Sequence, residues 1–128
     1  MRVDPAGAMA RMVRAIKDDV SASLSVGMPC KVIKFDAATC LADIQPLIRT
    51  SEDEPAVLQS IPALGQRLQI DGSEKVCKPA LKAGDVVFVV CADREIRNAM
   101  TGSISSADSG RMHDHNDAVI VGVFPCSL

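Results

Sequence analysis

The uninterrupted apolar run Val86–Cys91 constrains the fold of this chain more than any other segment. It follows the turn-forming pair Gly84-Asp85, and its length is that of a strand rather than of a helix. A strand that is apolar at every position is typical of burial on both faces, as at the centre of a closed barrel. The sequence therefore predicts that Val86–Cys91 is covered on both sides.

Shorter extended segments separated by turns surround this strand. The other predicted strands are Lys31–Phe35, Cys40–Ile48, Gln66–Ile70 with a resumption at Lys75–Lys78, and Ala118–Phe124. In the predicted strand Cys40–Ile48, apolar residues recur with a period of two and form one face. This face, which we expect to point inward, consists of Cys40, Ala42, Ile44 and Ile48. No spacing fits a crossover helix between parallel strands. We therefore expect a mainly β protein, a small OB-type barrel of five to six strands with an N-terminal α-helix.

The helix is predicted from about Pro5 to Leu24. Asp4 is a candidate N-cap, Pro5 suits the first turn, and Gly27 lies just beyond the end. Apolar residues recur every three or four positions, which places them on one stripe. A narrow stripe at the end of a small domain needs a partner surface. We expect residues 1–26 to form a contact helix and residues 27–128 to form the barrel, with the contact made by Met9, Met12, Val13, Ile16 and Val20.

The composition indicates an aliphatic core. Hydrophobic residues make up 48% of the chain, yet it has no Trp or Tyr and only three Phe, which lie in apolar strands and are predicted to be buried: Phe35, Phe88 and Phe124. The five cysteines are ten or more residues apart without a C-x-x-C pair, so we expect buried free thiols. Single-strand binders use exposed aromatic platforms in a positive groove. A net charge of −2 argues against such a surface, and an OB-fold module for single-stranded nucleic acid or a peptide remains the alternative.

The sequence His113-Asp114-His115 is the strongest candidate for chemistry. On an extended segment, side chains at i and i+2 point to the same side. One such pair supplies too few ligands for a structural metal site. Three pairs around a threefold axis would supply an octahedral set for a transition metal. We therefore expect either a trimeric metal site at His113 and His115 or a surface loop held by Asx-type hydrogen bonds.

No enzyme motif accompanies this pair. Asp93-Arg94 with Glu95 and Arg97 is predicted to form ion pairs at a barrel rim or a subunit interface. The sequence has no glycine-rich phosphate loop and no nucleophile elbow. We expect that the chain is not an enzyme.

Six motifs in a fixed order resemble the N-terminal OB-fold domain of the central spike proteins at the tail tip of contractile-tailed phages, over roughly residues 25 to 125. The motifs are Met28-Pro29-Cys30-Lys31-Val32 with Phe35-Asp36, Ala42-Asp43-Ile44-Gln45-Pro46-Leu47, Ile61-Pro62-Ala63-Leu64, Lys82-Ala83-Gly84-Asp85-Val86, Ala92-Asp93-Arg94, and Arg111-Met112-His113-Asp114 with Asp117-Ala118-Val119.

The resemblance implies a homotrimer on the tail axis, whose OB domains form a collar beside the baseplate hub and the tail-tube-end proteins. It implies synthesis in the host cytoplasm and a place in the virion baseplate or in a phage-like particle. The helix stripe would contact the hub or two symmetry mates. Related spikes hold axial His-x-His iron at their apex, which is a precedent for a transition metal such as iron at His113 and His115, although the resemblance implies no metal at the OB-domain position of His113. No nucleic acid is expected as a partner.

Spikes of this family continue into a triple-stranded β-helix that perforates the host envelope. The present sequence ends at Leu128, directly after the last predicted strand. We therefore expect a blunt spike, or an adaptor for a separate tip protein that meets the host cell envelope.

Overall fold

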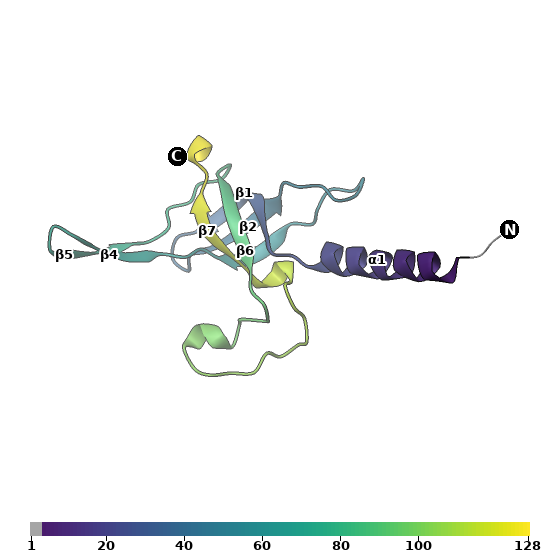
Figure 1. Cartoon of the computed structure of the whole chain (residues 1–128). Coiled ribbons are helices and arrows are strands. Elements are labelled where there is room, and N and C mark those ends of the chain that lie inside the picture. The colour runs from purple at the N-terminus through teal and green to yellow at the C-terminus, as the bar shows by residue number, and fades with distance from the viewer. Residues whose placement is uncertain (1–3) are drawn as a thin grey trace.

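The computed structural model describes residues 4–128, and its main body is a curled five-stranded antiparallel sheet (Figure 1). The strands are β1 (Gly27–Asp36), β2 (Leu41–Pro46), β3 (Leu58–Pro62), β6 (Val86–Cys91) and β7 (Ala118–Val123), in the order β3-β2-β1-β6-β7. Just beyond β3, Ala63 forms a parallel bridge to Ile120 of β7, so the two edges of the sheet meet. The Leu64 N–H also donates to the Ile120 carbonyl at 3.0 Å. This OB-like half-barrel confirms the predicted fold class.

The interior of the half-barrel is aliphatic, as the composition predicted. Phe35 packs only at its margin, and the buried residues include two thiols. The core consists of Cys30, Val32, Ala42, Ile44, Leu58, Ile61, Ala63, Val87, Val89, Cys91, Ala118 and Ile120.

The prediction of buried thiols holds for two of the five cysteines. Cys30 and Cys91 are buried, whereas Cys77 and Cys126 are exposed and Cys40 is intermediate. Burial raises the pKa of Cys30 to about 11, because the thiolate loses its hydration inside the barrel. Cys77 is the last residue of a projecting hairpin, and Cys126 lies in the C-terminal turn. Both have apolar neighbours in the sequence, but these neighbours do not cover the thiols in the fold.

β6 is buried on one face only, which corrects the prediction from its apolar run. Val87, Val89 and Cys91 point into the core, while Phe88 and Val90 are 37% and 38% exposed. A barrel strand has a single inner face, so alternate residues must point outward whatever their polarity. Phe88 and Phe124 were expected in the core, but they form an edge-to-face pair on the outside, with ring centroids 6.2 Å apart.

β2 is shorter than predicted, and its inner face is smaller. Ala42 and Ile44 are buried as expected. Cys40 instead lies in the β1–β2 turn with a φ of 57°, and Ile48 lies beyond the end of the strand and is exposed. The last residue of the strand is Pro46, which has no N–H to continue a ladder.

The segment expected to supply a third barrel strand forms a separate hairpin of β4 (Gln66–Ile70) and β5 (Ser73–Cys77). The turn at Asp71-Gly72 has φ values of 51° and 78°, which is the backbone of a type I′ turn. Every residue of both strands is exposed, and the hairpin projects from the barrel on the side opposite the N-terminal helix (Figure 1). The third strand of the main sheet along the chain is Leu58–Pro62 instead, and it lies at one edge of that sheet.

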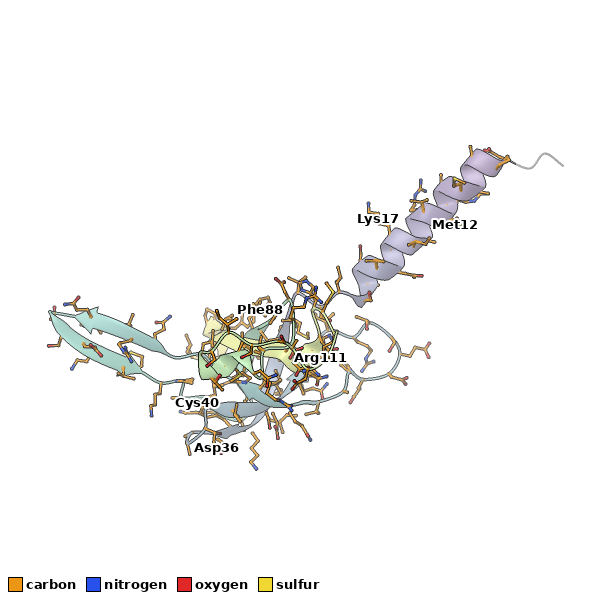
Figure 2. The ribbon with its side chains drawn as sticks, turned by 90° about the horizontal axis from the view of Figure 1, so that it is seen from below. Met12, Lys17, Asp36, Cys40, Phe88 and Arg111 are labelled. Carbon is orange, nitrogen blue, oxygen red and sulfur yellow. The ribbon has the colours of Figure 1, made fainter. Side chains whose placement is uncertain are left out.

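The N-terminal helix α1 (Pro5–Ser23) confirms the predicted helix to within a residue. Asp4 caps it by accepting a hydrogen bond from the Gly7 N–H at 3.1 Å, and Pro5 occupies the first turn. The helix extends away from the barrel, and none of its residues is buried (Figures 1 and 2). Among the described helices, none is long and apolar enough to cross a membrane.

Candidate functional site

The loop of residues 92–117, which joins β6 to β7, is organised around one buried carboxylate. Asp117 is 2% exposed, and the side chain of Glu95 in the same loop is 6% exposed. Arg111 donates two hydrogen bonds to Asp117, from Nε to Oδ2 at 2.7 Å and from Nη2 to Oδ1 at 2.9 Å. Such a two-pronged pair fixes both side chains in one orientation. The pair therefore fixes Arg111 beside Asp117, the last residue of the loop before β7.

The same arginine links Asp117 to the other side of the loop. Arg111 Nη2 lies 3.6 Å from Glu95 Oε2, and the Ser109 hydroxyl donates to that carboxylate at 2.7 Å. The hydrogen bonds from Arg111 hold the pKa of Asp117 below its usual range, although burial alone would raise that pKa. The pKa of Arg111 is raised, mainly by the same hydrogen bonds. The pair is therefore ionised at neutral pH.

Backbone hydrogen bonds tie the base of this loop to two other parts of the chain. The Ala92 N–H donates to the Asp117 carbonyl at 2.9 Å, which joins the two ends of the loop. The Ser25 N–H donates to the His113 carbonyl at 3.1 Å. The segment between α1 and β1 is thus anchored on the loop.

Of the four residues predicted to form ion pairs around Asp93-Arg94, only the two acidic ones have such partners, and both partners come from the other end of the loop. Asp93 lies 3.3 Å from His113 Nε2, and Glu95 contacts Arg111. Within residues 4–128, neither Arg94 nor Arg97 forms an ion pair. Glu95 therefore pairs with an arginine sixteen residues later in the chain, Arg111, and not with its sequence neighbours Arg94 and Arg97.

The structure does not place His113 and His115 on one extended segment. His113 has a φ of 47°, and His115 begins a short 3-10 helix, η2 (His115–Asp117). The predicted Asx-type hydrogen bond is present, because Asp114 Oδ1 accepts from the Asn116 N–H at 2.8 Å. His113 Nδ1 is buried without a hydrogen-bond partner, whereas His115 is exposed. In the described part of the chain, no three His, Cys, Asp or Glu side chains gather as a metal site.

The predicted contact residues of α1 lie on the surface. Each is more than half exposed, so the structure leaves the stripe available without showing what covers it: Met9, Met12, Val13, Ile16 and Val20. Met12 and Lys17 mark this helix in Figure 2, well away from the barrel.

A second exposed apolar surface was missed from the sequence. It covers the outside of β6 and β7 and consists of Phe88, Val90, Val121 and Phe124. The Phe88 ring packs closely against Gly27 at the start of β1, where an added Cβ would lie only 2.8 Å from the ring. Contiguous apolar surfaces of this kind mark sites of protein contact.

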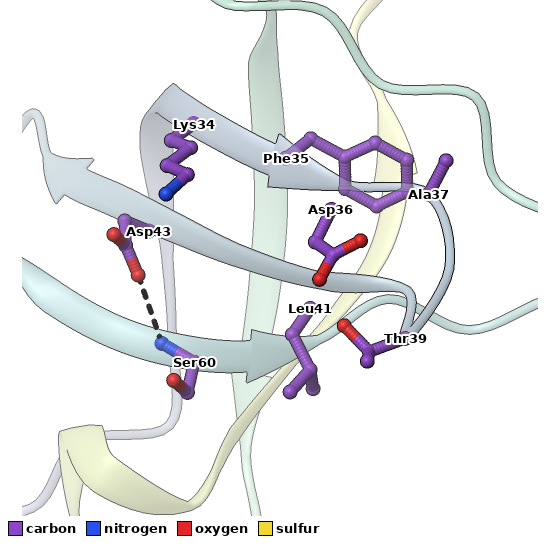
Figure 3. Close-up of a pocket in the computed structure, with 8 residues that line it drawn as sticks. All are labelled: Lys34, Phe35, Asp36, Ala37, Thr39, Leu41, Asp43 and Ser60. Atoms are coloured by element: carbon purple, nitrogen blue, oxygen red, sulfur yellow. Dashed lines mark hydrogen bonds between the residues drawn. The ribbon is translucent and has the colours of Figure 1, made fainter.

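A shallow hollow lies over the β1–β2 turn and the neighbouring part of β3 (Figure 3). Asp43 Oδ1 accepts a hydrogen bond from the Ser60 N–H at 3.1 Å, beside the register shifts where β2 pairs with β1 and with β3. This contact holds Ser60 at a φ of 56°. Asp43 in the hollow thus stabilises the irregular backbone at Ser60.

Comparison with known proteins places this architecture in a family. A family model described as the phage protein Gp138 N-terminal domain matches residues 28–122. The chain belongs to this family. The matched span of the Gp138 N-terminal domain family runs from β1 into β7 and includes the hairpin and the 92–117 loop, but not α1. No curated protein matches the chain. Membership confirms that this is a phage protein domain, as the sequence resemblance implied.

Proposed function

We propose that this protein is a structural component of a contractile-tail baseplate, a trimeric central spike or spike adaptor that caps the tail tube below the hub. Membership in the phage Gp138 N-terminal domain family over residues 28–122 is the observation that carries the proposal. The role requires no catalysis, and the chain acts by contact alone. The other partners would be the tail-tube-end proteins, a separate tip protein and the host envelope.

The exposed surfaces support an assembled protein. The α1 stripe, the outer surface of β6 and β7, and both faces of the β4–β5 hairpin are all exposed to solvent. An isolated two-stranded hairpin is at best marginally stable in water, and a helix in a protein gains most of its stability from packing of its amphipathic face. Closed symmetric assembly covers such surfaces repeatedly with one kind of contact. In a collar of three barrels below a hub, contacts between copies and with the hub would cover these exposed surfaces.

The trimeric metal site expected at His113 and His115 stays a prediction, because a single chain holds only one third of it. The imidazole of His113 faces Asp93 through Nε2, and its Nδ1 is buried. The His113 side chain is 26% exposed and His115 is exposed, but the two residues do not lie on one extended segment. The proposed function does not depend on a metal at these residues.

Labelling of intact particles tests the proposed location. Gold-conjugated antibodies against the purified chain should bind the baseplate end of the tail in electron micrographs. Particles made without the gene, and the same particles complemented with it, provide the matched control. Label on the capsid, or particles that contain none of the protein, would contradict the proposal.

A further inference from the structure

The apolar stripe of α1 has the spacing of a coiled-coil seam. With Ala6 as the first core position, alternating steps of three and four residues assign core positions a to Ala6, Val13 and Val20, and core positions d to Met9, Ile16 and Ser23. A repeat of seven residues drives helices to wind around each other with a left-handed twist. Met12 falls on the flank of this seam and not in it.

The seam is accessible along its whole length. No residue of α1 is buried, and the helix extends away from its own barrel (Figure 2). Between Ala8 and Ser23 the sequence has no Gly or Pro to interrupt the helix. Helices in proteins gain most of their stability from packing of an amphipathic face, so the exposed stripe of α1 indicates a partner along the seam.

The residues in the seam specify the kind of partner. Two-stranded coiled coils favour β-branched residues at a with Leu at d. Here Val occupies two a positions, but the d positions hold Met, Ile and Ser, so the two-stranded pattern is absent. Copies of the same helix have the same seven-residue repeat, so their a and d residues can pack together along the whole seam.

The charges beside the seam specify the orientation. Lys17 lies on one flank, at position e, and Asp19 lies on the other, at position g. In a parallel ring, the e flank of each helix faces the g flank of the next, so the flank that carries Lys17 runs beside the flank that carries Asp19. An antiparallel arrangement would face like flanks toward each other. The flanks therefore favour parallel helices.

We propose that the α1 helices of three copies wind into a parallel coiled coil on the axis of the assembly. This inference rests on the trimer of the proposed function and assigns α1 to its symmetry mates rather than to the hub. Because Ser25 is hydrogen-bonded to His113, the coil is attached to each barrel at the base of the 92–117 loop. The coil would thus hold the three barrels in a common orientation.

Disulfide trapping in the full chain tests this arrangement. The accessible thiols Cys40, Cys77 and Cys126 are first replaced by serine, and Met9→Cys or Arg11→Cys is then introduced. Position 9 is in the seam and position 11 is on the outer face of the helix. Under mild oxidation, Met9→Cys should form intermolecular disulfides at least tenfold faster than Arg11→Cys. Because only two of three chains can pair, the cross-linked fraction should level off at about two thirds.

Light scattering on the same samples separates the possible failures. A trimeric mass with equally slow cross-linking of both variants would overturn the coiled coil and leave the trimer standing. A monomeric mass would overturn both the coiled coil and the proposed function. Cross-linking that requires mixing Met9→Cys chains with Val20→Cys chains would overturn the parallel orientation.

Discussion

Replacing Asp117 with asparagine is expected to lower the free energy of unfolding by about 3 kcal/mol. Asp117 is 2% exposed and accepts two hydrogen bonds from Arg111. The amide keeps the shape of the carboxylate but presents an NH₂ group to one of the two donors and removes the charge that Arg111 neutralises. Calorimetry should show a fall in transition temperature of about 10 °C.

Asp93→Asn is the matched control in the same loop. The Asp93 carboxylate is largely exposed and lies 3.3 Å from His113, so its loss should change stability little. Equal transition temperatures for Asp117→Asn and the unmodified protein would contradict the structural role of the Arg111–Asp117 pair.

The same pair predicts how stability depends on acid. The folded protein holds the pKa of Asp117 below its unfolded value, so the unfolded chain takes up the proton first as the pH falls. The stabilisation is therefore complete above about pH 4 and is lost as the pH falls through the folded pKa. The difference in transition temperature between the unmodified protein and Asp117→Asn should narrow below pH 4. A difference that stays constant down to pH 2 would contradict the assignment.

Truncating Ile44 to alanine should lower the free energy of unfolding by about 3 to 4 kcal/mol. Ile44 is 0% exposed and lies in the sheet between Val32 and Leu58, so its loss opens a cavity at the centre of the core. Since whole domains are stable by only about 5–15 kcal/mol, the change is a large part of the total. Chemical unfolding followed by circular dichroism measures it.

Ile48→Ala provides the comparison for this variant. The sequence pattern places Ile44 and Ile48 on one inner face, but Ile48 is 58% exposed. Its truncation should change the free energy of unfolding by less than about 0.5 kcal/mol. Similar losses in the two variants would support the longer strand expected from the sequence over the one observed.

Local signals made the N-terminal helix and the barrel predictable. Asp4 and Pro5 specify the start of α1 through a cap and a first-turn proline, and both act within a few residues. The inner face of β2 was likewise predicted at Ala42 and Ile44, because a strand alternates its side chains locally. Such features depend on neighbouring residues alone.

Burial could not be predicted where it depends on the closure of the barrel. Phe88 and Val90 are apolar residues in an apolar strand, yet the barrel has only one inner face and leaves them outside. The β4–β5 hairpin has a recognisable turn at Asp71-Gly72, but its sequence does not say that the hairpin leaves the sheet. Both errors concern surfaces that an assembly would cover.

The Arg111–Asp117 pair was missed for a different reason. Both residues belong to the last of the six motifs, but they lie in a loop without periodicity, so no local pattern indicated that they pair. The spacing of His113 and His115 instead suggests metal ligands. An aspartate directly before an apolar strand, with an arginine a few residues earlier, is the signal that could have identified the pair.

The mass of the 128-residue chain in solution decides whether the exposed surfaces are contacts in a trimer. Light scattering coupled to size exclusion, over a range of protein concentrations, measures this mass without labels. A trimer has three times the 13.5 kDa of a single chain, and we expect that mass. A mass of one chain at every concentration would contradict this expectation.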